Sequence, residues 1–214
     1  TELGSEIRRM FVPSEGCVLV DADYSQIELR LLAHISGDSA MQAAFLSGED
    51  IHTTTAAHVF GVPPEEVTPQ MRRSAKAVNF GIVYGISPFS LSKDIGVSMA
   101  EAKEYMDSYF AKYRGVKQYM ESVVAQAKET GYVETLYHRR RALPELRSSN
   151  YNQRSFGERV ALNMPVQGTA ADIMKLAMVR VEQRLRQELP AARLVLQIHD
   201  ELILECPQAQ AEQA

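Results

Sequence analysis

The sequence predicts an α+β fold, in which strands from both ends of the chain form a small antiparallel sheet and a long helical segment is inserted between them. Two observations predict the strands. Residues 17–22 form a short apolar run interrupted by Asp21, and apolar and polar residues alternate from Leu194 to Glu205. A third observation predicts the insertion, because residues 38–130 follow a helical pattern almost throughout.

The first half of the chain contains clear signals for helix starts and stops. A helix is expected from Gln26 to about Ile35, after the first strand. Thr68 precedes Pro69 as an N-cap precedes a proline at the first helical position, and Ser98 with Glu101 fits a capping box. Glycine and proline predict stops at Gly48, at residues 61–64 and at residues 85–88.

The second half begins with an extended or hairpin segment. Residues 131–136 and the arginine-rich stretch after them predict this segment, and residues 154–189 predict a helix interrupted at Pro165. The alternation around His199-Asp200-Glu201 predicts a hairpin or a bent strand. Acidic clusters occur on strands only at the two chain ends, so pairing of the terminal strands would bring these carboxylates together.

Composition indicates an ordinary globular protein. Of its 214 residues 45% are hydrophobic and 23% charged, enough for one domain or two subdomains. No segment approaches the ~20 apolar residues that span a bilayer, and no basic run leads into an apolar stretch at the N-terminus, so we expect a soluble, cytoplasmic protein. Cys17 and Cys206 lack CxxC spacing, and two buried thiols are expected rather than a disulfide or metal site.

Charge alone does not favour a nucleic-acid partner, because the net charge is −4. Between Tyr137 and Arg159, however, six arginines and two glutamates give a local charge of +4. This arginine-rich segment permits two interpretations, a nucleic-acid contact or a solvated loop.

The terminal aspartates suggest a metal site. Mg²⁺ prefers oxygen ligands and is usually held by one or two carboxylates together with substrate phosphates. Two such ions about 3.5–4 Å apart can activate an attacking oxygen and stabilise a leaving one in phosphoryl transfer. Asp23 and Asp200 are the candidate ligands of two Mg²⁺ ions. The alternative is that each aspartate only stabilises a turn.

A stripe of cations and aromatics is predicted on the helix that begins near Pro69. Its members, four residues apart, are Arg72, Lys76, Phe80 and Tyr84. The stripe is about 18 Å long at a rise of about 1.5 Å per residue, and its cations lie where the helix dipole favours anions. A nucleoside triphosphate laid lengthwise would match it, phosphates first. The alternative is an amphipathic helix with both aromatics in the core.

Three segments resemble the motifs of family A DNA polymerases, in the family's order. They are Asp23-Tyr24-Ser25-Gln26-Ile27-Glu28-Leu29-Arg30, then Arg72 to Gly85, then His199-Asp200-Glu201. A fourth segment, from Arg159 to Asp172, is also similar to the family, and the similarity extends over essentially the whole chain. The resemblance implies a DNA-directed DNA polymerase that adds deoxynucleotides to a primer 3′-hydroxyl and releases pyrophosphate.

The resemblance also implies roles for single residues at the metal and nucleotide sites. Asp23 and Asp200 would hold the metals with the backbone carbonyl of Tyr24, and Glu201 is a weaker candidate. Arg72, Lys76 and His52 would contact the triphosphate, and Lys76 would protonate the pyrophosphate. Glu28, supported by Tyr84, would exclude ribonucleotides. Phe80 would lie by the sugar and discriminate against dideoxynucleotides. Gln26 is a further nucleotide-binding candidate.

The resemblance also implies which residues contact DNA and where the subdomains begin and end. Arg159 and Gln167, with Asn163 nearby, would touch the minor groove of the primer-template, and His199 would lie near the primer terminus. The palm would comprise residues 1–37 and 151–214, and the fingers residues 38–150.

Because the family's thumb, exonuclease-like domain and last palm elements have no counterpart here, the resemblance implies a monomeric fragment. The alternative is that the fragment folds and binds DNA but is catalytically inert. A single-subunit RNA polymerase is disfavoured by Glu28 and Phe80.

Overall fold

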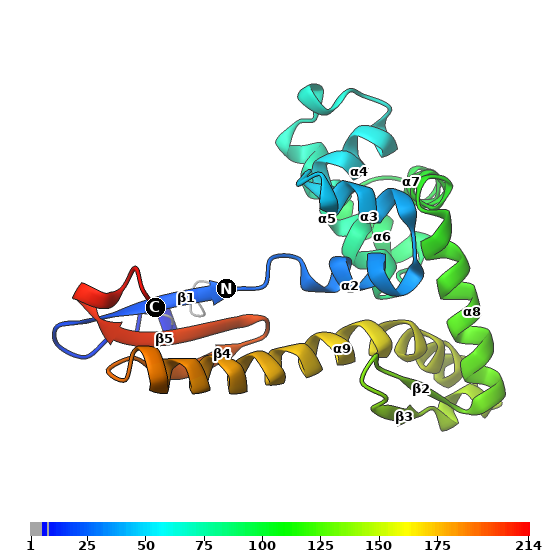
Figure 1. Cartoon of the computed structure of the whole chain (residues 1–214). Helices are drawn as coiled ribbons and strands as arrows, with labels where there is room; N and C mark the ends of the chain where they lie inside the picture. The colour runs from blue at the N-terminus through cyan, green and yellow to red at the C-terminus, as the bar shows by residue number, and fades with distance from the viewer. Residues whose placement is uncertain (1–5, 8) are drawn as a thin grey trace. The chain divides into compact units, whose positions relative to one another are not determined.

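The computed structural model describes residues 6, 7 and 9–214, and the chain divides into two compact units (Figure 1). One unit consists of the residues up to Ser25 together with Ala170–Ala214, and the other of Gln26–Thr169. Helix α2 (Ile27–Ser36) belongs to the second unit because it contacts three of its helices, which are α3 (Ser39–Leu46), α5 (Pro69–Val83) and α8 (Arg114–Thr130). The palm and fingers boundaries after residues 37 and 150 stay a prediction.

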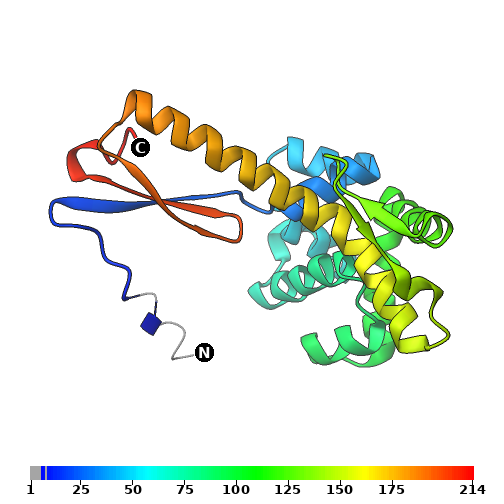
Figure 2. The same ribbon diagram turned by 90° about the horizontal axis from the view of Figure 1, so that it is seen from below.

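The first unit is built on a three-stranded antiparallel sheet, which Figure 2 shows from below. Strand β1 (Cys17–Asp23) pairs with the central strand β5 (Glu201–Pro207), which also pairs with β4 (Arg193–Ile198). A two-residue turn joins β4 to β5, as the alternating pattern predicts. The α+β prediction is confirmed, including the pairing of strands from the two ends of the chain.

The two faces of this sheet have different surroundings. Val18 and Val20 pack on one face with Leu185, Leu189 and the buried Cys206. Because side chains alternate along a strand, Asp21 and Asp23 point to the opposite face. Burial on one side therefore forces both aspartates to the other side.

The expectation of two buried thiols is only half correct, since Cys17 at the start of β1 is partly exposed.

The second unit is mostly helical. Besides α2 it contains α3 (Ser39–Leu46), α4 (Ile51–Phe60), α5 (Pro69–Val83), α6 (Pro88–Ile95), α7 (Met99–Lys112) and α8 (Arg114–Thr130). Both helix starts predicted from caps are confirmed. The hydroxyl of Thr68 accepts a hydrogen bond from the Met71 amide, and Ser98 and Glu101 form a reciprocal capping box. Short 3₁₀ turns occur at Pro64–Glu66, Pro144–Arg147 and Gln208–Gln210.

Helix α9 (Tyr151–Glu188) contradicts the interruption predicted at Pro165, because the helix is continuous through the proline. Proline removes the backbone donor that would serve the carbonyl four residues earlier, that of Ala161, and crowds that turn. One turn later the Thr169 hydroxyl donates to the Pro165 carbonyl at 2.6 Å and accepts from the Leu136 amide at 3.0 Å, which ties this part of the helix to Leu136. The predicted hairpin is present as β2 (Tyr132–Glu134) and β3 (Arg140–Ala142).

Gly115, in the first turn of α8, provides a test of how closely α8 packs against Asp38, the N-cap of α3. Its amide donates to Asp38 Oδ2 at 2.8 Å, and a Cβ atom placed on it would lie 2.9 Å from the Cα of Asp38. Since backbone atoms cannot move aside easily, Gly115→Ala is expected to lower the free energy of unfolding by about 1–3 kcal/mol in a urea titration. Gly157→Ala is the control, because its nearest neighbour is a side-chain methyl of Leu146. Equal losses in the two variants would contradict the packing argument.

Within residues 6, 7 and 9–214, none of the helices is both long and apolar enough to cross a membrane.

Candidate functional site

The carboxylates from the two ends of the chain meet in the first unit. Asp23 lies opposite Glu201 in the β1–β5 pair, and the Tyr24 amide donates to the Asp200 carbonyl at 3.1 Å. Asp21 lies opposite Ile203 on the same sheet face as Asp23. The structure thus brings together the two acidic clusters, as the sequence predicts.

The electrostatics of this group favour a cation. Partial burial, followed by the negative charges of Asp200 and Asp21, raises the pKa of Asp23 above its ordinary value. Among the described residues no three or more His, Cys, Asp or Glu side chains are arranged to hold a metal ion by themselves. A pair of carboxylates nevertheless fits Mg²⁺, which usually takes most of its other ligands from water and substrate phosphates. A metal at Asp23 and Asp200 would depend on a bound nucleotide to complete its ligands.

His199 occupies an unusual backbone position in the turn beside Asp200. Its φ angle is 53°, in the left-handed region that few residues other than glycine adopt. Histidine is one of the residue types enriched there, and the conformation presents an exposed imidazole next to the carboxylates.

The cation–aromatic stripe (Arg72, Lys76, Phe80 and Tyr84) belongs to the second unit. Arg72 and Lys76 are exposed, Phe80 is half-buried, and Tyr84 is the exposed C-cap of α5. The core of α5 is made by other residues, which are Ser74, Ala75, Val78, Asn79, Gly81, Ile82 and Val83. The alternative that places both aromatics in the core is therefore wrong for Tyr84. Lys76 Nζ lies 6.0 Å from the Phe80 ring centre.

Arg72 is held by an aspartate that the sequence reasoning did not select. Its Nε donates to Asp50 Oδ2 at 2.5 Å, and Asp50 also caps α4 by accepting from the His52 amide at 3.0 Å. Burial alone would raise the pKa of Asp50, but these hydrogen bonds and the charge of Arg72 hold it below its usual value. An N-cap at Asp50 can be read from Asp-Ile-His, but its pairing with a residue 22 positions away cannot.

His52 is buried between α4 and α5, with an exposed fraction of only 2%. Its Nδ1 lies 3.0 Å from Asn79 Nδ2, and its ring centre is 5.8 Å from that of Phe80. Burial lowers the pKa of His52; Arg72 and Lys76 lower it further, while Asp50 opposes them. The imidazole therefore lies close enough to both cations to feel their charge. Sequence reasoning missed Asn79, which had no distinguishing local pattern.

Glu28 and Tyr84 form a direct contact within the second unit. The Tyr84 hydroxyl donates to Glu28 Oε2 at 2.8 Å, which joins α2 to the end of α5 although 56 positions separate them. Gln26 begins α2 in the left-handed conformation, with φ of 59°, and its side chain does not cap the helix. The structure thus brings together Glu28 and Tyr84, as the resemblance implied.

Arg159, Asn163 and Gln167 are four residues apart on α9 and share one face of the helix. Gln167 is exposed, Arg159 donates to the Ser155 hydroxyl at 2.9 Å, and Asn163 Oδ1 is buried without a hydrogen bond in the described part of the chain. Arg159 also lines a cleft of about 780 Å³, together with Phe80, Tyr84 and Leu162. The cleft thus places Arg159 beside the aromatic end of the stripe.

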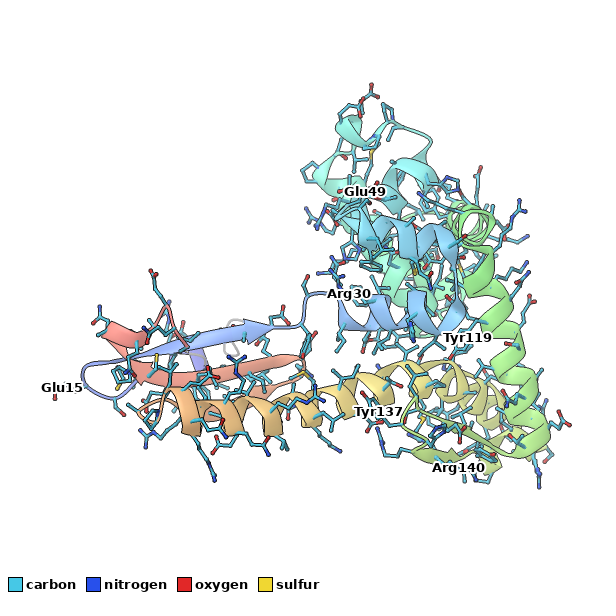
Figure 3. The ribbon with its side chains drawn as sticks, in the orientation of Figure 1. Glu15, Arg30, Glu49, Tyr119, Tyr137 and Arg140 are labelled. Carbon is cyan, nitrogen blue, oxygen red and sulfur yellow. The ribbon has the colours of Figure 1, made fainter. Side chains whose placement is uncertain are left out.

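Much of the arginine-rich segment has structural partners. Arg139 donates to the Gly168 carbonyl at 2.8 Å, and Arg154 donates to the carbonyls of Ser148 and Ser149. Arg140, labelled in Figure 3, bonds Glu134 at 3.1 Å and lies 4.5 Å from the Tyr132 ring centre. These contacts hold the β2–β3 hairpin and the following loop in place. The local charge of +4 therefore overstates the number of arginines available to an external anion.

The candidate residues divide between the units. Asp23, Tyr24, His199, Asp200 and Glu201 belong to the first unit, and all the others to the second.

Comparison with known proteins gives consistent results. The family described as DNA polymerase family A matches residues 1–214. The chain is 56% identical over 212 residues to DNA polymerase I of Bacillus caldotenax, covering 99% of this chain and 24% of that protein, and equally so to the Geobacillus stearothermophilus enzyme. DNA polymerase I of Bacillus subtilis is 55% identical over the same shares. The chain thus spans about a quarter of the length of these relatives.

A solved structure is similar over the whole chain. It is the POL domain of Pol1 from M. smegmatis in complex with a DNA primer-template and dNTP. The identity is 46% and the TM-score 0.93, covering 100% of this chain and 38% of that one.

Proposed function

Because the chain belongs to DNA polymerase family A, we propose that it carries the nucleotide and metal sites of a template-directed DNA polymerase. The reaction joins a deoxynucleotide to a primer 3′-hydroxyl and releases pyrophosphate. Palm residues 1–37 and 151–214 and fingers residues 38–150 are the proposed subdomains. The observation that carries the proposal is the β1–β5 register, which sets Asp23 beside the turn that contains Asp200.

Asp23 and Asp200 are the proposed ligands of two Mg²⁺ ions, with the Tyr24 carbonyl as a further ligand and Glu201 as a neighbour. Such ions, when bound, lower the pKa of an attacking hydroxyl and stabilise the charge on a leaving oxygen. The positions of the two carboxylates are fixed, because Asp23 ends β1 and Asp200 lies in the two-residue turn that leads into β5, the strand paired with β1. Their mutual repulsion is relieved by the cations.

The stripe on α5 is the proposed triphosphate site. Arg72, Lys76 and His52 supply donors to phosphate oxygens, and Lys76 is also the proposed proton donor to the departing pyrophosphate. To bind phosphate, the Arg72 guanidinium must either break its ion pair with Asp50 or contact Asp50 and the phosphates at the same time. Phe80 would lie by the sugar, and Gln26 would bind near the nucleotide.

The Glu28–Tyr84 contact is the proposed gate against ribonucleotides, because the carboxylate fills the space that a 2′-hydroxyl would need. Glu28→Ala is expected to raise ribonucleotide incorporation relative to deoxynucleotide incorporation by roughly 10-fold or more, the scale on which a pocket's shape discriminates. Extension assays with matched rNTP and dNTP measure this ratio. Glu101→Ala, which removes a carboxylate of the α7 cap, is the control. An unchanged ratio in Glu28→Ala would refute the gate.

Primer-template DNA is the proposed partner. Arg159, Gln167 and Asn163 would lie along the minor groove, where acceptors are largely shared by all base pairs, and His199 would lie near the primer terminus. A complex with primer-template and dNTP in the similar Pol1 structure supports this assignment.

The experiment that tests the function is extension of a labelled primed template by the purified protein with Mg²⁺ and dNTP. Template-dependent extension is expected. The second candidate is a folded but inert DNA-binding module, which is supported by the excess of arginine between Tyr137 and Arg159. Salt-sensitive binding of the primed template without any extension would favour the second candidate.

A further inference from the structure

Four polar side chains form a buried chain of contacts between α4, α5 and the start of α8. The contacts are Tyr113 Oη to Thr55 Oγ1 at 3.4 Å, Thr55 Oγ1 to Asn79 Oδ1 at 3.2 Å, and Asn79 Nδ2 to His52 Nδ1 at 3.0 Å. The exposed fraction is 0% for Tyr113 and Asn79, 1% for Thr55 and 2% for His52. We refer to these four residues as the buried network.

Packing alone does not account for Asn79 in this network. A buried amide is unfavourable unless its donors and acceptors have partners. The other buried residues of α5 near it, Val78 and Ile82, are apolar, and a leucine at position 79 could fill a similar volume without needing hydrogen bonds. The amide therefore contributes something that an aliphatic side chain would not.

The contacts in the buried network have a direction. The Thr55 hydroxyl donates its single proton to Asn79 Oδ1, so at Tyr113 it can only accept. Burial raises the pKa of the Tyr113 phenol, which keeps the donor proton in place. Asn79 Nδ2 can only donate a hydrogen bond, so His52 Nδ1 must accept it with its lone pair.

The proton of the His52 ring is thereby left on Nε2. Burial, and then the charges of Arg72 and Lys76, lower the pKa of His52 against the opposing charge of Asp50, which favours a neutral ring. A neutral ring with a proton on Nε2 is a hydrogen-bond donor at that atom. The other neutral tautomer would turn a lone pair toward the same position.

We propose that Asn79 is a positioning residue, which holds His52 in the Nε2–H tautomer and thereby presents a hydrogen-bond donor to a phosphate oxygen of the bound nucleotide. The proposal rests on the proposed function, in which His52 contacts the triphosphate beside Arg72 and Lys76. Phosphate oxygens accept hydrogen bonds and do not donate them when ionised, so only this tautomer of a neutral ring is complementary. Tyr113 and Thr55 fix the orientation of the Asn79 amide.

The tautomer can be measured directly by NMR on protein labelled with ¹⁵N-histidine. The His52 signals are assigned by their loss in His52→Gln. We expect a proton on Nε2 and none on Nδ1, with the Nδ1 shift changing in Asn79→Leu because its hydrogen bond is lost. A proton on Nδ1 in the unsubstituted protein overturns the proposal, and this measurement requires no variant at position 79 to fold.

A double-mutant cycle tests whether Asn79 acts through His52. Asn79→Leu is expected to raise the dissociation constant for Mg²⁺–dATP about tenfold, while kcat for extension changes little. The same substitution in a His52→Ala background should have no further effect, because the residue that it positions is gone. Val78→Ala, a neighbouring core variant outside the buried network, is the control and should leave nucleotide affinity unchanged. An equal loss with and without His52 overturns the proposal.

Failure of this proposal is distinguishable from failure of the proposed function. If His52→Ala weakens nucleotide binding but Asn79→Leu does not, the triphosphate site stands and only the positioning role of Asn79 is overturned. If His52→Ala leaves nucleotide affinity unchanged, the proposed contact of His52 with the triphosphate is wrong, and the role of Asn79 falls with it.

Discussion

Asp23→Ala is expected to reduce the rate of primer extension by about a thousandfold or more. Asp23 is a proposed ligand of Mg²⁺ ions that would stabilise charge on the attacking and the leaving oxygen, and its loss would remove several kcal/mol of that stabilisation. Asp200→Ala should produce a loss of the same size, because the two carboxylates act together. Single-turnover extension of a primed template in saturating Mg²⁺ and dNTP measures the rate.

Asp21→Ala is the matched control for this prediction. Asp21 is on the same strand and the same sheet face as Asp23, but it pairs with Ile203 rather than with Glu201. Its charge contributes to the raised pKa of Asp23 only after that of Asp200. We expect Asp21→Ala to cost at most about tenfold, a difference of about 1.4 kcal/mol in the barrier. If Asp21→Ala were as damaging as Asp23→Ala, or if extension survived Asp23→Ala, the choice of metal ligands would be wrong.

Lys76→Ala is expected to lower kcat by roughly 10²- to 10⁴-fold, the range typical of a lost general acid. Lys76 is exposed on α5 near Arg72 and Phe80, so the substitution opens no cavity in the core. In the proposed function two roles would be lost at once, because the ammonium group would both bind phosphate and donate a proton. Steady-state kcat and KM for dNTP, with circular dichroism to confirm folding, measure the effect.

Lys76→Arg separates these two functions. The guanidinium keeps the charge but does not release its proton near neutral pH, so KM should be nearly retained while kcat falls. Arg73→Ala is the control, since Arg73 is an adjacent exposed cation on the same helix but outside the stripe. If Lys76→Arg retained full kcat, Lys76 would bind phosphate without acting as the acid.

Local sequence signals predicted most elements correctly. The caps at Thr68 and Ser98 are satisfied as expected, because a capping hydrogen bond joins residues only three positions apart. Arg72, Lys76 and Tyr84 of the stripe are exposed and Phe80 is half-buried, whereas periodicity alone allowed both aromatics to lie in the core. The interruption predicted at Pro165 was wrong. Proline removes one backbone donor and crowds one turn, but the 38-residue helix α9 continues through it, so the proline by itself does not decide where the helix ends.

The residues that sequence reasoning missed are those selected by contacts between distant parts of the chain. Asp50 became a site residue only through Arg72, 22 positions later, and Asn79 only through His52, 27 positions earlier. Neither has a pattern of its own, since aspartate at an N-cap and asparagine within a helix are common for local reasons.

By itself the sequence determined the types and order of most elements, the α+β class, and the candidate residues of the proposed nucleotide and metal site, because these depend on short-range periodicity and on recognisable motifs. Tertiary structure alone decided the register that sets Asp23 opposite Glu201, the Arg72–Asp50 and Glu28–Tyr84 contacts, and the buried network around His52. Such contacts join residues that are far apart in the chain. They form only when many apolar side chains have packed together, so they reflect the whole fold rather than any local pattern.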